Sequence, residues 1–221
     1  PQTVAVIGAS RDPDKLGYAV VKNLIDSGFA SERTLYPINP TADEILGIKA
    51  YPSVLDVPGE VDLAVIVIPY KFVPQAMREC GQKGVKSVVV ITAGFREAGQ
   101  EGLAREREII QIARENRMRM IGPNCLGVID TYTPLNASFA AGTPPKGPIN
   151  FMSQSGALGT AVLDWALGGK MGFSKFVSLG NKADVSEIDL LQAWADDPNS
   201  NVTLAYIEGV PEGQRFIETA R

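Results

Sequence analysis

The sequence predicts a doubly wound α/β fold, in which helices cover both faces of a parallel sheet. Two features indicate it. Short runs rich in Val and Ile alternate with helical patterns, and runs such as Leu-Ala-Val-Ile-Val-Ile are apolar on both faces of the strand they would form. Hydrophobic residues make up 45% of the chain and charged residues 21%, which is enough apolar material for an ordinary globular core.

The predicted elements fall into two groups. In the first, strands are predicted at 3–8, 34–39, 61–68, 86–92 and 118–122, with helices at 15–28, 71–83 and 100–116. In the second, strands are predicted at 148–153, 174–180 and 202–209, with helices at 156–168, 186–196 and in the last residues.

The Pro- and Gly-rich stretch 140–148 between the groups is typical of a linker. We therefore expect one domain over 1–143 and another over 144–221. Three strands do not complete a parallel sheet, so we expect the second domain to continue past this chain.

Composition excludes several function classes. The net charge of −4 and the pI near 5.0 argue against a nucleic-acid partner, and the longest apolar run is strand-sized, so we expect no membrane partner. Two cysteines without CxxC spacing suit a reduced, cytoplasmic protein. The chain has no histidine, which removes imidazole catalysis and the commonest metal ligand, and we predict no metal site.

The first candidate site is the loop from Gly8 to Gly17, between a buried strand and a helix. Gly8 allows a sharp turn, Ala9 and Ser10 leave the backbone accessible, and Lys15 brings positive charge. Free N–H groups at the start of the helix suit a phosphate. An ordinary strand-to-helix turn is the alternative.

The same loop argues against a nicotinamide cofactor. It is longer than the G-x-G-x-x-G loop, and a dinucleotide site needs an acidic residue after the second strand to bind the ribose. That strand ends instead in Asn39-Pro40. We therefore favour a differently shaped nucleotide.

Other candidate residues lie where later strands end. They are Pro69, the run Ile91-Thr92-Ala93, the turn residues Asn124 and Cys125, the helix start Ser153, Ser155 and Gly156, the loop residues Gly180 and Asn181, and Glu208. Thr92 can donate a hydrogen bond to a ligand, and Ser155-Gly156 is a second possible anion site at a helix N-terminus. A Cys125 nucleophile is disfavoured because no histidine can activate it.

In these loops, taken in order along the whole chain, the sequence resembles the CoA-binding portion of the NDP-forming acyl-CoA synthetases. The resemblance is strongest to the α part of ADP-forming acetyl-CoA synthetase and more distant to the succinyl-CoA synthetase α-subunit. The motifs that carry it are VAVIGAS…KLG, PINP, VVVITAGF, IGPNCLGVI, MSQSGALG and SLGNKAD. It implies a CoA-binding Rossmann-like domain followed by a flavodoxin-like domain, of which this chain would hold an incomplete part.

The resemblance also implies roles for the candidate residues. CoA would be bound by Gly8, Ala9, Ser10, Lys15, Gly17, Asn39, Pro40, Pro69, Ile91, Thr92 and Ala93. Ser153, Ser155 and Gly156 would cradle a phosphohistidine that Glu208 orients, Asn124 and Cys125 would approach it and the CoA thiol, and Gly180 and Asn181 would face the acyl group. The histidine itself lies outside this chain, so the segment is expected to be inactive alone.

The function implied is that of an acid–CoA ligase. A carboxylic acid, CoA and ATP would be interconverted with acyl-CoA, ADP and phosphate through an acyl phosphate. ATP and Mg²⁺ would bind to a partner ATP-grasp domain or subunit, in a homo- or hetero-oligomer. One alternative is a non-catalytic CoA-binding or regulatory module, alone or fused to an acyltransferase. Another, which Asn39 disfavours, is an NAD(P)-dependent oxidoreductase.

Overall fold

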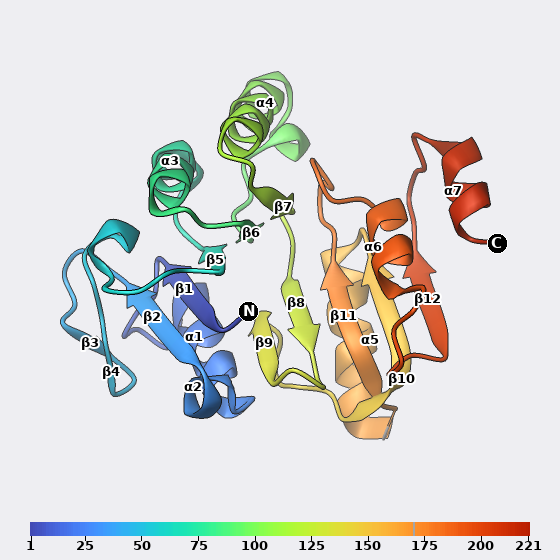
Figure 1. The fold of residues 1–221 in the computed structure, drawn as a ribbon, viewed down its shortest axis with the longest axis horizontal. Helices are drawn as coiled ribbons and strands as arrows, with labels where there is room; N and C mark the ends of the chain where they lie inside the picture. The colour runs from blue at the N-terminus through green and yellow to red at the C-terminus, as the bar shows by residue number, and fades with distance from the viewer. Residues whose placement is uncertain (170) are drawn as a thin grey trace.

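In the computed structural model, which describes residues 1–169 and 171–221, two five-stranded sheets lie side by side (Figure 1). All strands of the first sheet are parallel, in the order β2-β1-β5-β6-β7. Their bounds are β1 (Thr3–Ile7), β2 (Thr34–Ile38), β5 (Leu63–Ile66), β6 (Ser87–Val90) and β7 (Arg119–Ile121). The sequence therefore predicted the strands and their parallel direction correctly.

Helices cover both faces of this sheet. Helix α1 (Leu16–Asp26) packs on one face, and α3 (Val73–Lys83) and α4 (Gln100–Glu115) pack on the other. From β1 the chain continues to β2 on one side, whereas from β5 it continues to β6 and β7 on the other side. The connections therefore diverge between the neighbouring strands β1 and β5. In open α/β sheets, this divergence leaves a crevice at the carboxyl ends of the two strands, where ligands bind.

Short elements complete this part of the chain. They are α2 (Phe29–Glu32), the hairpin of β3 (Glu44–Ile45) and β4 (Ile48–Lys49), and single 3₁₀ turns at Val54–Asp56, Tyr70–Phe72 and Arg96–Ala98. The last two turns follow β5 and β6, at the same edge as the crevice.

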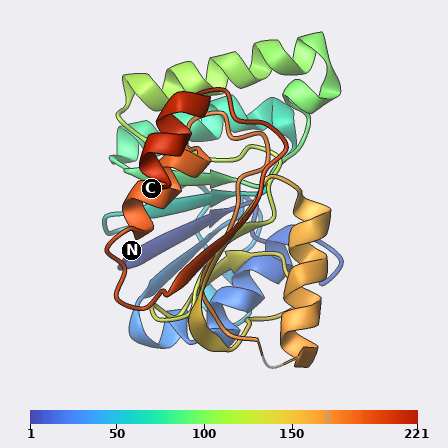
Figure 2. The same cartoon turned by 90° about the vertical axis from the view of Figure 1, so that its right-hand side faces the viewer.

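The second sheet is mixed, in the order β12-β10-β11-β8-β9. Its strands are β8 (Gly127–Asp130), β9 (Leu135–Ser138), β10 (Lys146–Ser153), β11 (Phe173–Ser178) and β12 (Val202–Tyr206). Strand β10 runs parallel to β11 and β12, whereas β8 is antiparallel to β11 and to β9. Helices α5 (Gly156–Gly169) and α6 (Glu187–Trp194) pack on opposite faces, and α7 (Gly213–Thr219) ends the chain at the edge (Figure 2).

The hairpin of β8 and β9 corrects the sequence analysis, which expected no strand in this stretch and only parallel strands in the second sheet. β8 pairs with β11, while Leu135 and Ala137 of β9 pack with α1 of the first sheet. Asn23 of α1 donates hydrogen bonds from its side chain to the carbonyls of Ser138 at 2.9 Å and Ala140 at 2.8 Å. The hairpin therefore joins the two sheets.

The predicted linker is shorter than expected, because β10 begins at Lys146. Within the described residues, no helix combines the length and apolar character that a bilayer crossing requires.

Candidate functional site

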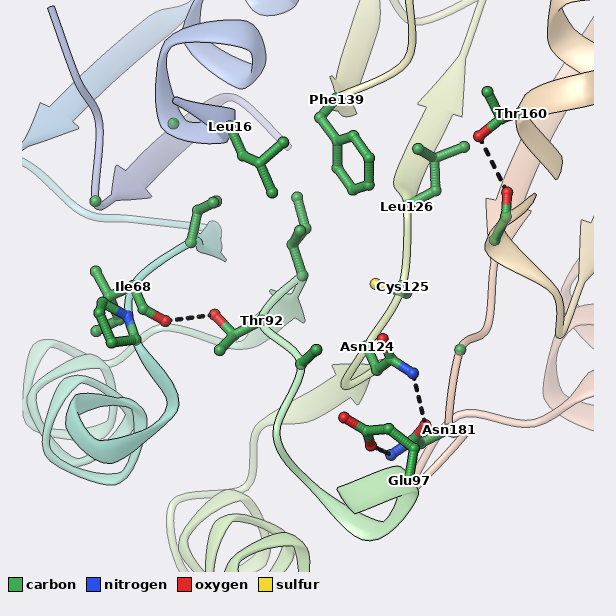
Figure 3. A pocket seen from close by; sticks show the side chains of 18 of the residues that line it. Leu16, Ile68, Thr92, Glu97, Asn124, Cys125, Leu126, Phe139, Thr160 and Asn181 are labelled. Atoms are coloured by element: carbon green, nitrogen blue, oxygen red, sulfur yellow. Dashed lines mark hydrogen bonds between the residues drawn. The ribbon is translucent and has the colours of Figure 1, made fainter. Parts of the chain in front are cut away.

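A cavity of about 1160 Å³ lies where the carboxyl ends of strands from both sheets meet (Figure 3). Every predicted site residue lines it except Pro40 and Ser153. Pro40 is exposed beyond the rim, and Ser153 is buried behind the wall. The tertiary structure thus brings together, in one cavity, loops that lie as far apart in the sequence as Gly8 and Glu208.

The first loop is built on a close approach between two glycines. Gly8 has φ 96°, a left-handed conformation that favours glycine. A Cβ atom on Gly17 would lie 1.9 Å from the carbonyl oxygen of Gly8, so no side chain fits there. Helix α1 then begins after Lys15 without a side-chain cap. Its first amides are consequently left for a ligand.

Local hydrogen bonds hold this loop in shape. Ser10 Oγ accepts from the backbone N–H of Asp12 at 3.0 Å. Asn39, at the end of β2, donates from Nδ2 to the carbonyl of Ala9 at 2.8 Å, and its Oδ1 accepts from the N–H of Thr41 at 2.9 Å. The position that carries an acid in dinucleotide sites therefore holds an amide that is already committed to the loop.

Thr92 lines the cavity but does not use its proton as predicted. Its hydroxyl donates to the carbonyl oxygen of Ile68 at 2.7 Å (Figure 3). The Thr92 hydroxyl can therefore only accept a hydrogen bond from a ligand, and any other contact would be through the backbone of Thr92. The hydroxyl instead ties the end of β6 to the end of β5.

Cys125 is unsuited to nucleophilic chemistry. The thiol is buried and donates weakly to the carbonyl of Val90 at 3.4 Å. Burial raises the pKa of the Cys125 thiol to about 12, so the thiolate is scarce at neutral pH. Cys125 forms part of the cavity wall.

The second loop, at the start of α5, is capped by its own serines. Ser153 Oγ accepts from the N–H of Ser155 at 3.1 Å and donates to its carbonyl at 2.7 Å. Ser155 Oγ accepts from the N–H of Leu158 at 3.2 Å. No atom lies within 4 Å of where a Cβ on Gly156 would be. Ser153 therefore shapes the loop from behind, and Gly156 opens it to the cavity.

Glu208 is exposed in the loop after β12 and is held in place by Gln154. Gln154 Oε1 accepts from the N–H of Glu208 at 2.9 Å, and its Nε2 donates to the carbonyl of Gly209 at 3.2 Å. Lys182 donates to the same carbonyl at 2.6 Å and to the buried carboxylate of Glu187 at 2.7 Å. These contacts fix the 208–209 loop against the start of α5.

The cavity wall also carries a group of charged residues that was not predicted from the sequence. Arg96 and Glu97 lie in the short turn that follows β6. Burial opposes the ionisation of Glu97, but hydrogen bonds from Asn181 and from the backbone N–H groups of Gly94 and Phe95 outweigh it and lower the pKa of the carboxyl. No pattern in the sequence indicates that this turn faces Asn181.

Comparison with known proteins gives the family. The model of the CoA binding domain matches residues 2–131, and that of the succinyl-CoA ligase like flavodoxin domain matches residues 146–221. The chain belongs to the CoA-binding domain family. The resemblance found in its sequence is thereby confirmed, and the CoA-binding segment contains the Gly8–Gly17 loop.

Similar proteins are ligases of greater length. Subunit alpha of the ADP-forming acetate–CoA ligase II of Pyrococcus furiosus is 50% identical over 100% of this chain and 48% of its own length. The ADP-forming 4-hydroxybutyrate–CoA ligase of Nitrosopumilus maritimus is 44% identical over 100% of this chain and 32% of its own length. The chain thus spans half or less of the length of these relatives.

A solved structure has the same fold. Dinucleotide-forming acetyl-coenzyme A synthetase 1 of Ca. Korarchaeum cryptofilum, in complex with phosphate and ADP, superimposes with a TM-score of 0.96 at 44% identity. The match covers 100% of this chain and 47% of that one. The fold predicted from sequence, a Rossmann-like parallel sheet followed by a second α/β unit, is therefore confirmed.

Proposed function

We propose that this chain is the CoA-binding part of an ADP-forming acid–CoA ligase. The observation that carries the proposal is the single cavity shared by two helix N-termini, α1 from the CoA-binding segment and α5 from the flavodoxin-like segment. One cavity can thus bring CoA and a phosphoryl-carrying group to the same reacting acid.

The first loop fits the phosphates of CoA. The uncapped start of α1 offers backbone N–H groups, and Lys15 at the cavity rim adds a positive charge. The cavity volume of about 1160 Å³ is above the range of roughly 300–1,000 Å³ that is typical of small-molecule sites. That size suits a long ligand whose thiol end must reach the second loop.

The second loop fits the other half of the reaction. Helix N-termini stabilise a transferring phosphoryl group by their dipole and amides. Ser155 and Gly156 would hold this group on a histidine supplied from outside the chain, and Glu208, fixed by Gln154, would orient that histidine. Gly180 and Asn181 would face the acid, whose identity differs among relatives named for acetate and 4-hydroxybutyrate.

ATP and Mg²⁺ would bind to an ATP-grasp partner domain or subunit. This proposal is supported by the relatives, which are longer than this chain or are named as one subunit. We place the protein in the cytoplasm, because both cysteines are free thiols buried in the fold.

Calorimetry with CoA tests the first loop. Ser10→Asp keeps an acceptor for the N–H of Asp12 but adds a negative charge, whereas Ser10→Asn keeps the acceptor without the charge. We expect wild type and Ser10→Asn to bind CoA alike, and Ser10→Asp to bind at least about tenfold more weakly. NADH binding without competition from CoA, or equal CoA affinity in all three proteins, would refute the assignment.

A second measurement separates a ligase from a CoA-binding regulatory module. With the ATP-grasp partner and the histidine-bearing segment present, labelled ATP should give an acid-labile phosphohistidine that is discharged by the acid and CoA. A module would bind CoA without carrying phosphate.

A further inference from the structure

Two carboxylates of the CoA-binding segment converge on one amide of the flavodoxin-like segment. Asn181 Nδ2 donates to Oε2 of Glu97 at 2.6 Å and to Oε2 of Glu106 at 2.7 Å. Glu106 projects from α4 and is 3% exposed. Arg96 contacts the same group, donating to the carbonyl of Asn181 from Nη2 and placing Nε 3.9 Å from Glu106.

These contacts determine which way the Asn181 amide faces. The carboxylate oxygens of Glu97 and Glu106 accept both bonds, so the NH₂ end of the amide points at them. Both of its protons are then used, and Oδ1 must face the opposite way. On that side Oδ1 accepts from Asn124 Nδ2 at 3.3 Å (Figure 3).

The orientation passes to Asn124, which lines the cavity. Because Asn181 presents an acceptor, Asn124 must present its NH₂ end, and one of its two protons is used in that contact. Among the residues that the structure describes, no group accepts the other proton. Backbone geometry restrains this residue as well: its N–H donates to the carbonyl of Thr92 at 3.0 Å, and its φ is 57°.

We infer that the free N–H of Asn124 binds the carboxyl oxygen of the acid substrate. Asn181 is the positioning residue that sets this direction, and Glu97 and Glu106 hold Asn181. The inference rests on the proposed function, since it presumes a ligase that activates a carboxylic acid in this cavity.

The charges nearby indicate why the ligand group is a carboxyl. A neutral donor can bind an oxygen of the substrate carboxylate and, more weakly, the thioester carbonyl of the product. Arg96 and Glu97 lie on this wall with opposite charges, so the wall offers no excess of positive charge for a doubly charged phosphate. A donor for the carboxyl group alone also suits relatives named for different acids.

Steady-state kinetics of the complete ligase, with the ATP-grasp partner, test the donor. Asn124→Asp preserves shape and tolerates the left-handed backbone, but replaces the donor by a carboxylate. We expect the KM for the acid to rise at least about tenfold and the KM for CoA to change less than about twofold. Glu108→Gln, on the exposed side of α4, is the control and should change neither.

A polarity swap tests the positioning role. Asn181→Asp places a third carboxylate against Glu97 and Glu106 and should raise the KM for the acid. Adding Glu106→Gln supplies a donor to the new carboxylate, which still accepts from Asn124. The double variant should therefore recover to within about threefold of wild type, a rescue that a loss of packing would not show.

The outcomes separate the two proposals. An unchanged KM for the acid in Asn124→Asp, equal rises for acid and CoA, or no rescue by Glu106→Gln would overturn the inference alone. If Asn181→Asp does not fold, the Asn124→Asp result decides. A wild-type protein that does not bind CoA would instead refute the proposed function.

Discussion

Helices α1 and α5 both begin at the cavity, but their first turns are built differently. The start of α1 has no side-chain cap, and its Gly17 is packed so tightly on Gly8 that a Cβ would lie 1.9 Å from a carbonyl oxygen. The start of α5 is capped by Ser155, and Gly156 has no neighbour within 4 Å of a Cβ position.

The difference matches two kinds of ligand. A closed loop with free amides suits a phosphate that binds and leaves as part of a whole molecule. An open loop capped by a serine hydroxyl suits a phosphoryl group that arrives on another residue and is then transferred. The shape of the first loop thus depends on its own backbone packing. The site at the second loop depends on the neighbouring loops that Gln154 holds in place.

The largest expected effect comes from filling the closed loop. Gly17→Ala forces the backbone of Gly8 to move, and we expect a loss of roughly 3 kcal/mol in the free energy of unfolding together with loss of CoA binding. Urea denaturation and calorimetry measure the two effects.

Gly156→Ala is the matched variant in the open loop. Its methyl group meets no atom, so we expect the free energy of unfolding to change by less than about 1 kcal/mol. If both variants lose stability equally, the two loops do not differ in packing as described.

An intermediate effect is expected from the support of the second loop. Gln154→Met keeps the side-chain length but loses the hydrogen bonds to the backbone of Glu208 and Gly209. We expect phosphoryl transfer in the complete ligase to fall about thirtyfold, since two bonds of about 1 kcal/mol each are lost, with CoA affinity unchanged.

The control for Gln154→Met is Gln192→Met on the exposed side of α6, which should leave both properties as in wild type. A fall in CoA affinity in Gln154→Met would show that Gln154 supports the first loop as well.

The smallest effect is the pH dependence of stability that comes from the contact between Glu97 and Asn181. The pKa of Glu97 is lowered, so its contribution to stability is present above its usual value of 4.5 and is lost as pH falls through the lower folded value. Glu97→Gln should therefore give a shallower decline in the free energy of unfolding on acidification below 4.5.

Other carboxyl groups also contribute to the fall in the free energy of unfolding at acid pH. Asp62, Asp189 and Asp197 also have lowered pKa values, so a residual decline should remain in the variant. Glu101→Gln, whose side chain is 88% exposed, is the control and should follow wild type. If the free energy of unfolding of Glu97→Gln depends on pH as it does in wild type, the contact of Glu97 with Asn181 does not stabilise the fold.

The sequence by itself determined the first sheet and the position of nearly every cavity loop. Continuous apolar runs require burial on both faces, and a parallel sheet places the ends of its strands at one edge. Local patterns of this kind located Gly8, Gly156 and Glu208, and the lack of an acid near Asn39 pointed away from NAD.

Only the tertiary structure decided how the two units join. The β8–β9 hairpin pairs with one sheet and packs on a helix of the other, and the contact of Glu97 and Glu106 with Asn181 crosses more than 70 residues of sequence. Periodicity reports which face of an element is apolar, but not which distant element will cover it. The direction of a hydrogen-bond donor such as Asn124 depends on partners that only folding brings together.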